Sequence, residues 1–475
     1  TSLIQRYAYG QYVNLRECSS SINVSTDYQR FLNSARTSSI TLSYLFTNKP
    51  GNSRTITTYP TALANPSAPI LKPSSAAADT RSSEHTVQAD FTTPLSQHQT
   101  LNMGLKFIAR RNISDAKFFD LSSGTPTYEA SNSTNYKNHQ HILAGYTEYG
   151  LNLDKWSTKT GLRYEHTWEE VKFLLGRGAD FNKHYGCLVP SFSFTYNLKP
   201  TMNIGLNYGM RISRPGISYL NPYVDRSQTT TISYGNPDLE VEKSHNVSLV
   251  FNTFTPKLMI NFSIGENFAN NQIEQYSFLK DGVLHNTYGN ILRTRWTNIG
   301  TFINWAATTN TRFMLNAHVD YGDIRSYQLD SRNHGWQFDA FAGIQQTLPW
   351  KIKLSSFVGG STHKYTLQGY NGGFNIMAHT LTKSFFKDKL DLSLRYVVPF
   401  TGKLNIKQYS HGKDFDVHTT THVPVQNAVI SVTWRFGNTS RQFEQHRSKI
   451  SNDFQEAEKS NSQTSGVGSK GGVGM

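Results

Sequence analysis

The feature that most constrains this chain is a two-residue alternation of apolar and polar side chains that recurs along most of its length. Residues 201–213 read TMNIGLNYGMRIS. One face carries Met202, Ile204, Leu206, Tyr208, Met210 and Ile212, and the other carries Asn203, Gly205, Asn207, Gly209, Arg211 and Ser213. This is the period of a β-strand. The segment is therefore expected to be a strand with one apolar and one polar face.

The same alternation returns at residues 101–107, 258–265, 312–320 and 390–396. The strands that contain these runs are expected to be about 9–14 residues long, whereas ordinary strands have about 5–6, and about 9–11 residues cross a bilayer at a tilt. Short connections such as 198–201 and 255–257 alternate with long polar segments such as 215–240 and 270–292. Short turns on one side and long loops on the other are typical of outer-membrane barrels.

About 18 strands are expected between Leu3 and Phe436. A soluble sandwich or propeller would need a partner for every apolar face. A closed barrel in lipid needs none and leaves no unpaired backbone edge. We therefore predict an all-β, transmembrane, antiparallel up-and-down β-barrel, with Leu206 facing lipid and Asn207 facing the lumen.

The composition argues against several other classes of protein. The 475 residues contain no run of 18 apolar side chains, and mean hydropathy is −0.50, so a helical membrane span is excluded. The formal charge is +14, but the cations are scattered along the chain, so no nucleic acid is expected as a partner. Two cysteines, Cys18 and Cys187, are too few for a disulfide framework.

The domain boundary is expected near Gly437. The last alternating segment, AVISVTWRF (428–436), places Trp434 and Phe436 at an interfacial aromatic girdle. Residues 1–437 are predicted to form the barrel, and 438–475 a polar, Gly/Ser-rich periplasmic tail. Residues 466–471 match GxGxxG, but a dinucleotide site needs a strand before it and a helix after it, so this motif is interpreted as tail.

Several longer stretches resemble one family. NYGMRISRPGISYLNPYVD (207–225), ISYGNPDLEVEKSHN (232–246), DYQRFLNSARTSSITLSY (27–44), GLRYEHT (161–167) and HQHILAGYTEY (139–149) are similar to segments of Bacteroidota-type TonB-dependent outer-membrane receptors. The resemblance extends over nearly the whole chain. It implies a 22-stranded barrel filled by an N-terminal plug and opened by TonB.

This sequence departs from the family pattern, because it shows no plug, no TonB-contacting segment and only about 18 strands. We therefore expect the C-terminal part of a longer receptor, in which the loops capture a nutrient and the lumen passes it inward. A complete smaller barrel, acting as a surface receptor, adhesin or passive porin, is the alternative. The expected partners are outer-membrane lipid, TonB through an N-terminal region absent here, and a surface lipoprotein as a further candidate.

The loop from Arg214 to Glu242 is the strongest candidate for a ligand site. Prolines and glycines in RPGISYLNPYVD and YGNPD stiffen it. The side chains that could stack on a ligand or hydrogen-bond to it are Tyr219, Asn221, Tyr223, Asp225 and Tyr234. In the alternative interpretation the loop only folds over the rim of the barrel and pairs with its neighbours.

Enzyme, metal and cofactor chemistry find little support. His139 and His141 share a strand face but lack a third ligand at a useful spacing, so they are expected to be lumen or rim residues. His411, His418 and His422 lie in one predicted loop and also fit a polar surface. No GxSxG elbow occurs. The chain is therefore expected to be no enzyme and to hold no metal or cofactor.

Overall fold

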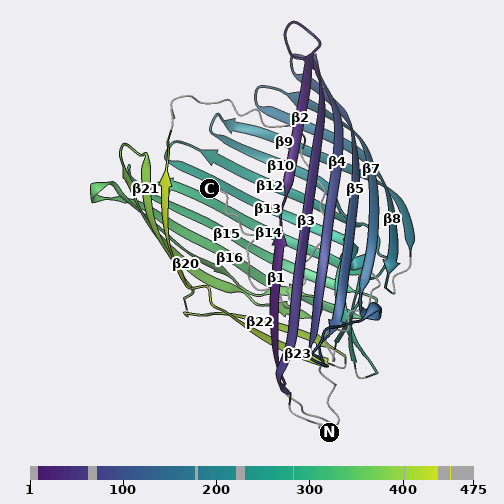
Figure 1. The fold of residues 1–475 in the computed structure, drawn as a ribbon. Helices are drawn as coiled ribbons and strands as arrows, with labels where there is room; N and C mark the ends of the chain where they lie inside the picture. Colours follow the sequence, from purple (N-terminus) through teal and green to yellow (C-terminus); the bar gives the residue numbers. More distant parts are fainter. Residues whose placement is uncertain are drawn as a thin grey trace.

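The computed structural model describes residues 9–62, 72–176, 180–220, 231–281, 283–400, 402–413, 415–436 and 450. Almost all of them belong to one large antiparallel β-sheet, whose long strands lie side by side at a tilt and curve into a wall (Figure 1). Within these residues no helix is long and apolar enough to cross a membrane. The expected tail 438–475 lies outside the described residues, apart from Ile450.

The first part of the wall contains mostly strands of 19 to 24 residues. Its elements are β1 (Tyr9–Ser19), β2 (Ile22–Phe31), β3 (Ser39–Ala62), β4 (Ser74–Ser96), β5 (Gln99–Asp120), β6 (Thr127–Tyr128), η1 (Ala130–Asn132), β7 (Thr134–Asn152), β8 (Trp156–Leu175) and β9 (Phe181–Lys199).

The second part continues the wall and adds a small separate sheet. Its elements are β10 (Met202–Ser213), α1 (Ile217–Leu220), β11 (Thr231–Ser233), β12 (Glu242–Phe254), β13 (Leu258–Lys280), β14 (Val283–Ala306), β15 (Thr311–Ser326), β16 (Ser331–Leu348), η2 (Pro349–Lys351), β17 (Ile352–Ser361), β18 (Lys364–Thr366), β19 (Gly369–Asn371), β20 (Phe374–Phe385), β21 (Leu390–Val398), β22 (Leu404–Gly412), β23 (Phe415–Val423) and β24 (Asn427–Trp434). Strands β18, β19, β22 and β23 form the small sheet.

Each long strand pairs antiparallel with the next one along the chain. β1 and β2 pair with successive halves of β3 and act as one strand. Without the short β6 and β11, the 20-stranded sheet is thus a wall of seventeen strands from β1–β2 to β24. In the described residues these two edges do not pair with each other. Because the number is odd, both edge strands run in the same direction.

The strands are longer than the sequence alternation indicated. Residues 270–292 were expected to be the loose, polar apex of a hairpin, but β13 extends to Lys280 and β14 begins at Val283, with the two strands paired up to the turn. The expectation was wrong because alternation marks only the part of a strand in lipid. Beyond the lipid both faces are polar, while the backbone ladder continues.

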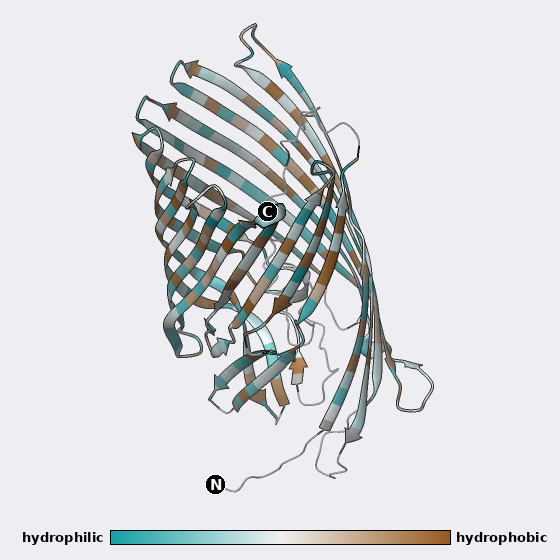
Figure 2. Cartoon of the chain, turned by 90° about the vertical axis from the view of Figure 1, so that its left-hand side faces the viewer, coloured by the Kyte–Doolittle hydropathy of each residue, from teal (hydrophilic) through white to brown (hydrophobic). Residues whose placement is uncertain are grey.

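The two faces of the wall have opposite chemistry, and the strands in Figure 2 show alternating hydrophilic and hydrophobic residues along their length. One outward row runs across six neighbouring strands through Leu206, Leu249, Ile264, Ile299, Val319 and Phe338, and most of its side chains are exposed. Polar side chains such as Thr86, Lys106, Asn138 and Thr167 are buried on the inner face. Apolar side chains outside and polar side chains inside are the reverse of the arrangement in a soluble protein, and they fit a wall with lipid on its outer face. Leu206 lies on this outer face, as predicted.

Exposed tryptophans mark the edges of the apolar band. Trp156 and Trp168 both lie on the outer face of β8. Their twelve-residue separation is about 40 Å along a strand at about 3.3 Å per residue, or about 30 Å along the membrane normal at a tilt of about 40°. This matches the hydrocarbon thickness of a bilayer. Trp434 and Phe436 are also exposed, as expected for girdle residues.

Candidate functional site at the long-loop mouth

The segment after β10 is anchored to the inner wall by Arg214. The buried guanidinium donates hydrogen bonds to Thr167 Oγ1 (3.3 Å) and to the Glu165 carboxylate. Glu165 also accepts from Arg163. Because Arg214 bonds to inward-facing side chains of β8, it holds the start of the RPG sequence against the inner face of the wall. The segment therefore begins inside the rim of the barrel.

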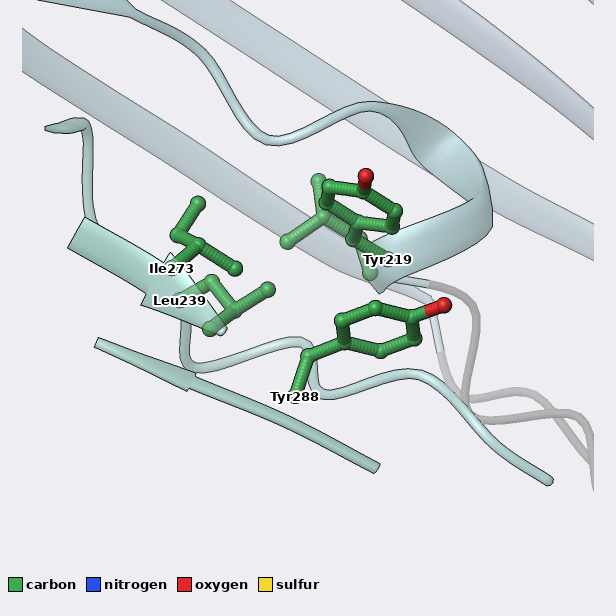
Figure 3. Close-up of a cluster of buried hydrophobic side chains, with 5 residues drawn as sticks. Tyr219, Leu239, Ile273 and Tyr288 are labelled. Carbon is green, nitrogen blue, oxygen red and sulfur yellow. The ribbon is translucent and has the colours of Figure 1, made fainter. Parts of the chain in front are cut away.

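Tyr219 is buried, at 3% exposure, rather than presented to solvent. Its ring stacks on Tyr288 of β14, with the centroids 4.4 Å apart. Leu220, Leu239 and Ile273 complete the hydrophobic cluster (Figure 3). This cluster fixes α1 against β13 and β14.

The GNPD sequence ties the same segment to β14. The Asn236 side chain accepts from the Asp238 N–H (2.9 Å) and donates to the Tyr288 carbonyl (3.0 Å), and its backbone N–H donates to the Tyr219 carbonyl. An asparagine that closes its own turn is a known turn device, but its second bond depends on a partner 52 residues away. The sequence marked this motif without showing that it joins the loop to the wall.

The other predicted site residues are placed differently. The Tyr234 N–H donates to the Asn286 carbonyl (3.1 Å), and the ring packs edge-on against His285 with centroids 6.0 Å apart. Burial raises the pKa of Tyr234, so its hydroxyl is neutral at physiological pH. Asn221, Tyr223 and Asp225 lie outside the described residues. Of the predicted set, the structure therefore describes Tyr219 and Tyr234.

A cavity of about 380 Å³ opens beside the buried tyrosine pair. We call it the mouth cavity. Its lining includes four tyrosines, five side-chain amides and one carboxylate: Tyr219, Tyr288, Tyr365, Tyr409, Gln275, Asn286, Gln368, Asn371, Gln408 and Glu274. Rings and amides of this kind suit an uncharged polar ligand, through stacking and hydrogen bonds. The cavity is lined by two separate parts of the chain, residues 219–288 and residues 365–419.

The small sheet supplies the other wall of the mouth cavity. Gln368 holds it to β13, since its amide accepts from the Ser277 N–H (3.1 Å) and donates to the Ser277 carbonyl (3.3 Å). The Tyr409 hydroxyl donates to Asp416 (2.8 Å), which also contacts His411 Nδ1 (2.8 Å). The Tyr409 hydrogen bond, followed by that of His411, lowers the pKa of the Asp416 carboxyl. Asp416 is therefore an anion at neutral pH.

The histidines considered for metal binding have other contacts. His422 Nδ1 lies 2.5 Å from Asn405 Oδ1, and the ring of His418 lies 4.7 Å from that of Tyr409. His141 stacks on the outward Phe107 at 5.9 Å, so it lies on the outer face and not in the lumen. In the part of the chain that the structure describes, no three His, Cys, Asp or Glu side chains gather as metal ligands.

Below the mouth, the inner wall carries a row of hydrogen-bonded side-chain amides. On β12–β15 the amides of Asn246, Asn267 and Asn298 each donate to the next residue, and the last donates to Asp320 (2.6 Å). A second cavity of about 600 Å³ is lined by Asn207 and other polar residues of β7–β10 and β12–β13. Asn207 thus lies on the inner face, as predicted. A polar ligand that leaves the mouth would meet these hydrogen-bonding groups.

An outward apolar band between tryptophan belts and a polar inner wall define a bacterial outer-membrane β-barrel protein. The chain belongs to the outer membrane protein beta-barrel family, which matches residues 29–434. No curated protein matches the sequence.

Solved structures with a similar fold are uptake receptors and transporters. The ferric yersiniabactin uptake receptor FyuA from Yersinia pestis is 11% identical, with a TM-score of 0.54 over 83% of this chain and 60% of that one. The ferric-catecholate import receptor Fiu from K12 E. coli is 12% identical, with a TM-score of 0.62 over 88% and 64%. The copper transporter OprC is 11% identical, with a TM-score of 0.59 over 88% and 72%.

These likenesses establish the fold, which is that of the β-barrel wall of these receptors and transporters. The compared proteins are named as receptors or transporters, not as enzymes. The chain spans about three fifths of the length of FyuA.

Proposed function

We propose that this chain forms part of the barrel wall of a TonB-dependent outer-membrane transporter. The mouth cavity captures a nutrient on the cell surface, and the polar inner wall passes it inward once a plug has moved. The observation that carries the proposal is the combination of a hydrogen-bonded polar inner face with a ligand-sized cavity at one end. An adhesin would need the outer loops but not a polar path beneath them.

The open sheet supports a longer transporter of which this chain is part. Direct closure would pair β1–β2 with β24 in parallel, whereas bacterial barrels have an even number of antiparallel strands. An unpaired strand edge in lipid costs several kcal/mol for each unsatisfied group. An odd number of additional strands, together with a plug, would close the wall and seal its lumen. The TonB contact is assigned to that additional part, and a surface lipoprotein is a candidate partner for the outer loops.

Planar-bilayer recordings and uptake measurements test this function. The chain refolded alone is expected to give no uniform channel, because its edges cannot pair. Cells that make the complete gene product are expected to accumulate one member of a panel of labelled glycans, peptides, vitamins and ferric siderophores, and to lose this accumulation when TonB is deleted. A uniform stable channel from the chain alone, with uptake independent of TonB, would instead identify a complete passive porin.

The orientation of the wall gives a separate prediction. The turn between β15 and β16 is expected to face the outside and the turn between β9 and β10 the periplasm. Single cysteines at Gln328 and at Lys199, in a Cys18→Ser/Cys187→Ser background, would be treated in intact cells with a membrane-impermeant thiol reagent. Labelling is expected at position 328 and not at 199, with both labelled after lysis. The reverse pattern in intact cells would invert the topology.

A further inference from the structure

The outer face of β14–β16 carries a cluster of cations toward the long-loop end. In register, Arg293 lies opposite Arg325, and Arg325 lies opposite Arg332. One row nearer the apolar band, Arg295 lies opposite Asp323. We call the four arginines with Asp323 the arginine face.

Alternation along the strands shows that these side chains point away from the lumen. Ile324, between Asp323 and Arg325, is buried and packs with Leu292 and Leu367 on the inner side. The neighbours of Ile324 must therefore project outward. The side chains of Arg325 and Arg332 are 43% and 50% exposed, and Arg293 and Arg295 are also exposed. The arginine face thus looks toward the membrane and not into the transport path.

One carboxylate positions two of the guanidinium groups. Arg325 Nε donates to both Asp323 oxygens (3.1 Å each), and Arg332 donates through Nε (2.9 Å) and Nη2 (3.1 Å). Arg293 is held by Tyr327, whose ring centroid lies 4.9 Å away. Arg295 has no acidic partner among the described residues. The face therefore has a net positive charge and free N–H donors in a fixed arrangement.

The height of the arginine face coincides with the edge of the lipid. Arg295 and Arg325 lie eleven and fourteen residues from the tight-turn ends of β14 (Ala306) and β15 (Thr311). At about 2.5 Å of height per residue these separations are about 28 and 35 Å. The corresponding height of Trp168 on β8 is about 30 Å by the same measure. Tyr321 and Trp336 lie just below the arginines on the same outer face. Lipid headgroups occupy this level.

We propose that the arginine face binds the phosphate groups of a phosphorylated glycolipid of the outer leaflet, of the lipid A type. Guanidinium forks match phosphate oxygens in pairs, and clustered cations at the membrane surface attract anionic headgroups. Ile299, Val319 and Phe338, below the aromatic pair, lie where the acyl chains would pack. The ligand is inferred to be a lipid because the arginines lie on the same outer face as this apolar surface, directly on its long-loop side. It rests on the orientation proposed above.

Native mass spectrometry of the chain in a zwitterionic detergent tests the site, with bis-phosphorylated lipid A as the probe. The variant Arg293→Gln/Arg325→Gln/Arg332→Gln is expected to bind at least about tenfold more weakly, since each lost charge-assisted hydrogen bond accounts for about that factor. Removal of the phosphates from lipid A should weaken its binding to the unmodified chain by the same factor as the triple substitution weakens the binding of intact lipid A. Millimolar inorganic phosphate should not displace the lipid.

A matched variant separates this site from general charge. Arg81→Gln/Arg111→Gln/Lys172→Gln removes the same charge from outward positions on β4, β5 and β8, and it should keep unmodified affinity. An equal loss of lipid A affinity in both triple variants would overturn the proposal. So would binding of dephosphorylated lipid A or phosphatidylglycerol to the unmodified chain as tightly as lipid A. Displacement of lipid A by millimolar inorganic phosphate would also overturn it. If the triple variant does not fold, Arg332→Gln should lose more affinity than Arg332→Lys. Cysteine labelling tests the orientation independently.

Discussion

Replacement of Ile264 by arginine is expected to destabilise the folded wall by about 2–4 kcal/mol, because it places a charge near the bilayer midplane. Ile264 lies six residues above the tight-turn end of β13, about 15 Å along the membrane normal by rise and tilt. Its side chain is 42% exposed on the outer face. Urea titration of the refolded protein in lipid vesicles measures the change in the free energy of unfolding.

Two companion variants make the Ile264 result specific. Leu206→Arg is on the same outward row but only four residues above its turn, so its cost should be smaller because the penalty falls toward the interface. Asn207→Arg enters the lumen cavity of about 600 Å³ and should cost less than about 1 kcal/mol, as other exposed substitutions do. Equal losses for Ile264 and Asn207 would contradict the assignment of the two faces.

Replacement of Arg110 by methionine is expected to cost about 3–5 kcal/mol, since it leaves the Glu84 carboxylate buried without its cation. Arg110 Nε donates to Glu84 Oε2 at 2.8 Å, and the two side chains are 9% and 6% exposed. Thr86 donates a further hydrogen bond to the same carboxylate at 3.3 Å. The free energy of unfolding in vesicles again provides the measurement.

The double variant Glu84→Gln/Arg110→Met should recover most of the lost stability, because a neutral amide can keep the Thr86 hydrogen bond without a buried charge. As a control, Lys172→Met breaks the Lys172–Glu170 pair, whose side chains are 59% and 44% exposed, and should cost less than about 1 kcal/mol. A double variant no more stable than Arg110→Met would show that the loss does not come from an uncompensated charge.

Much of the wall can be predicted from local sequence. Alternation such as that around Leu206 and Asn207 assigned each face, because the side-chain period of a strand is two whatever its partner. Short turns such as 198–201 separated the strands for a similar reason, since a tight connection joins neighbouring antiparallel strands. Both signals are local, and both are confirmed by the pairing of β9, β10 and β12.

The candidate site could be predicted only in part. The segment from Arg214 to Glu242 stood out by its prolines and glycines, but nothing local showed that Tyr219 would stack on Tyr288 or that Asn236 would bond to the same residue. Tyr365, Gln368 and Tyr409 of the mouth cavity gave no signal, because isolated tyrosines and glutamines are common on any polar strand. Their proximity comes from the small sheet, which no alternation marks.

The sequence by itself determined that the chain forms long antiparallel strands with a lipid-facing and a polar side, since burial in lipid forces a side-chain period of two and internal pairing of every backbone group. Only the tertiary structure decided how far the strands extend beyond the lipid, which side chains meet at the mouth, and that Arg293, Arg325 and Arg332 lie beside one another on the outer face. These features depend on register between strands, and register is set by pairing across the sheet and not by any one segment.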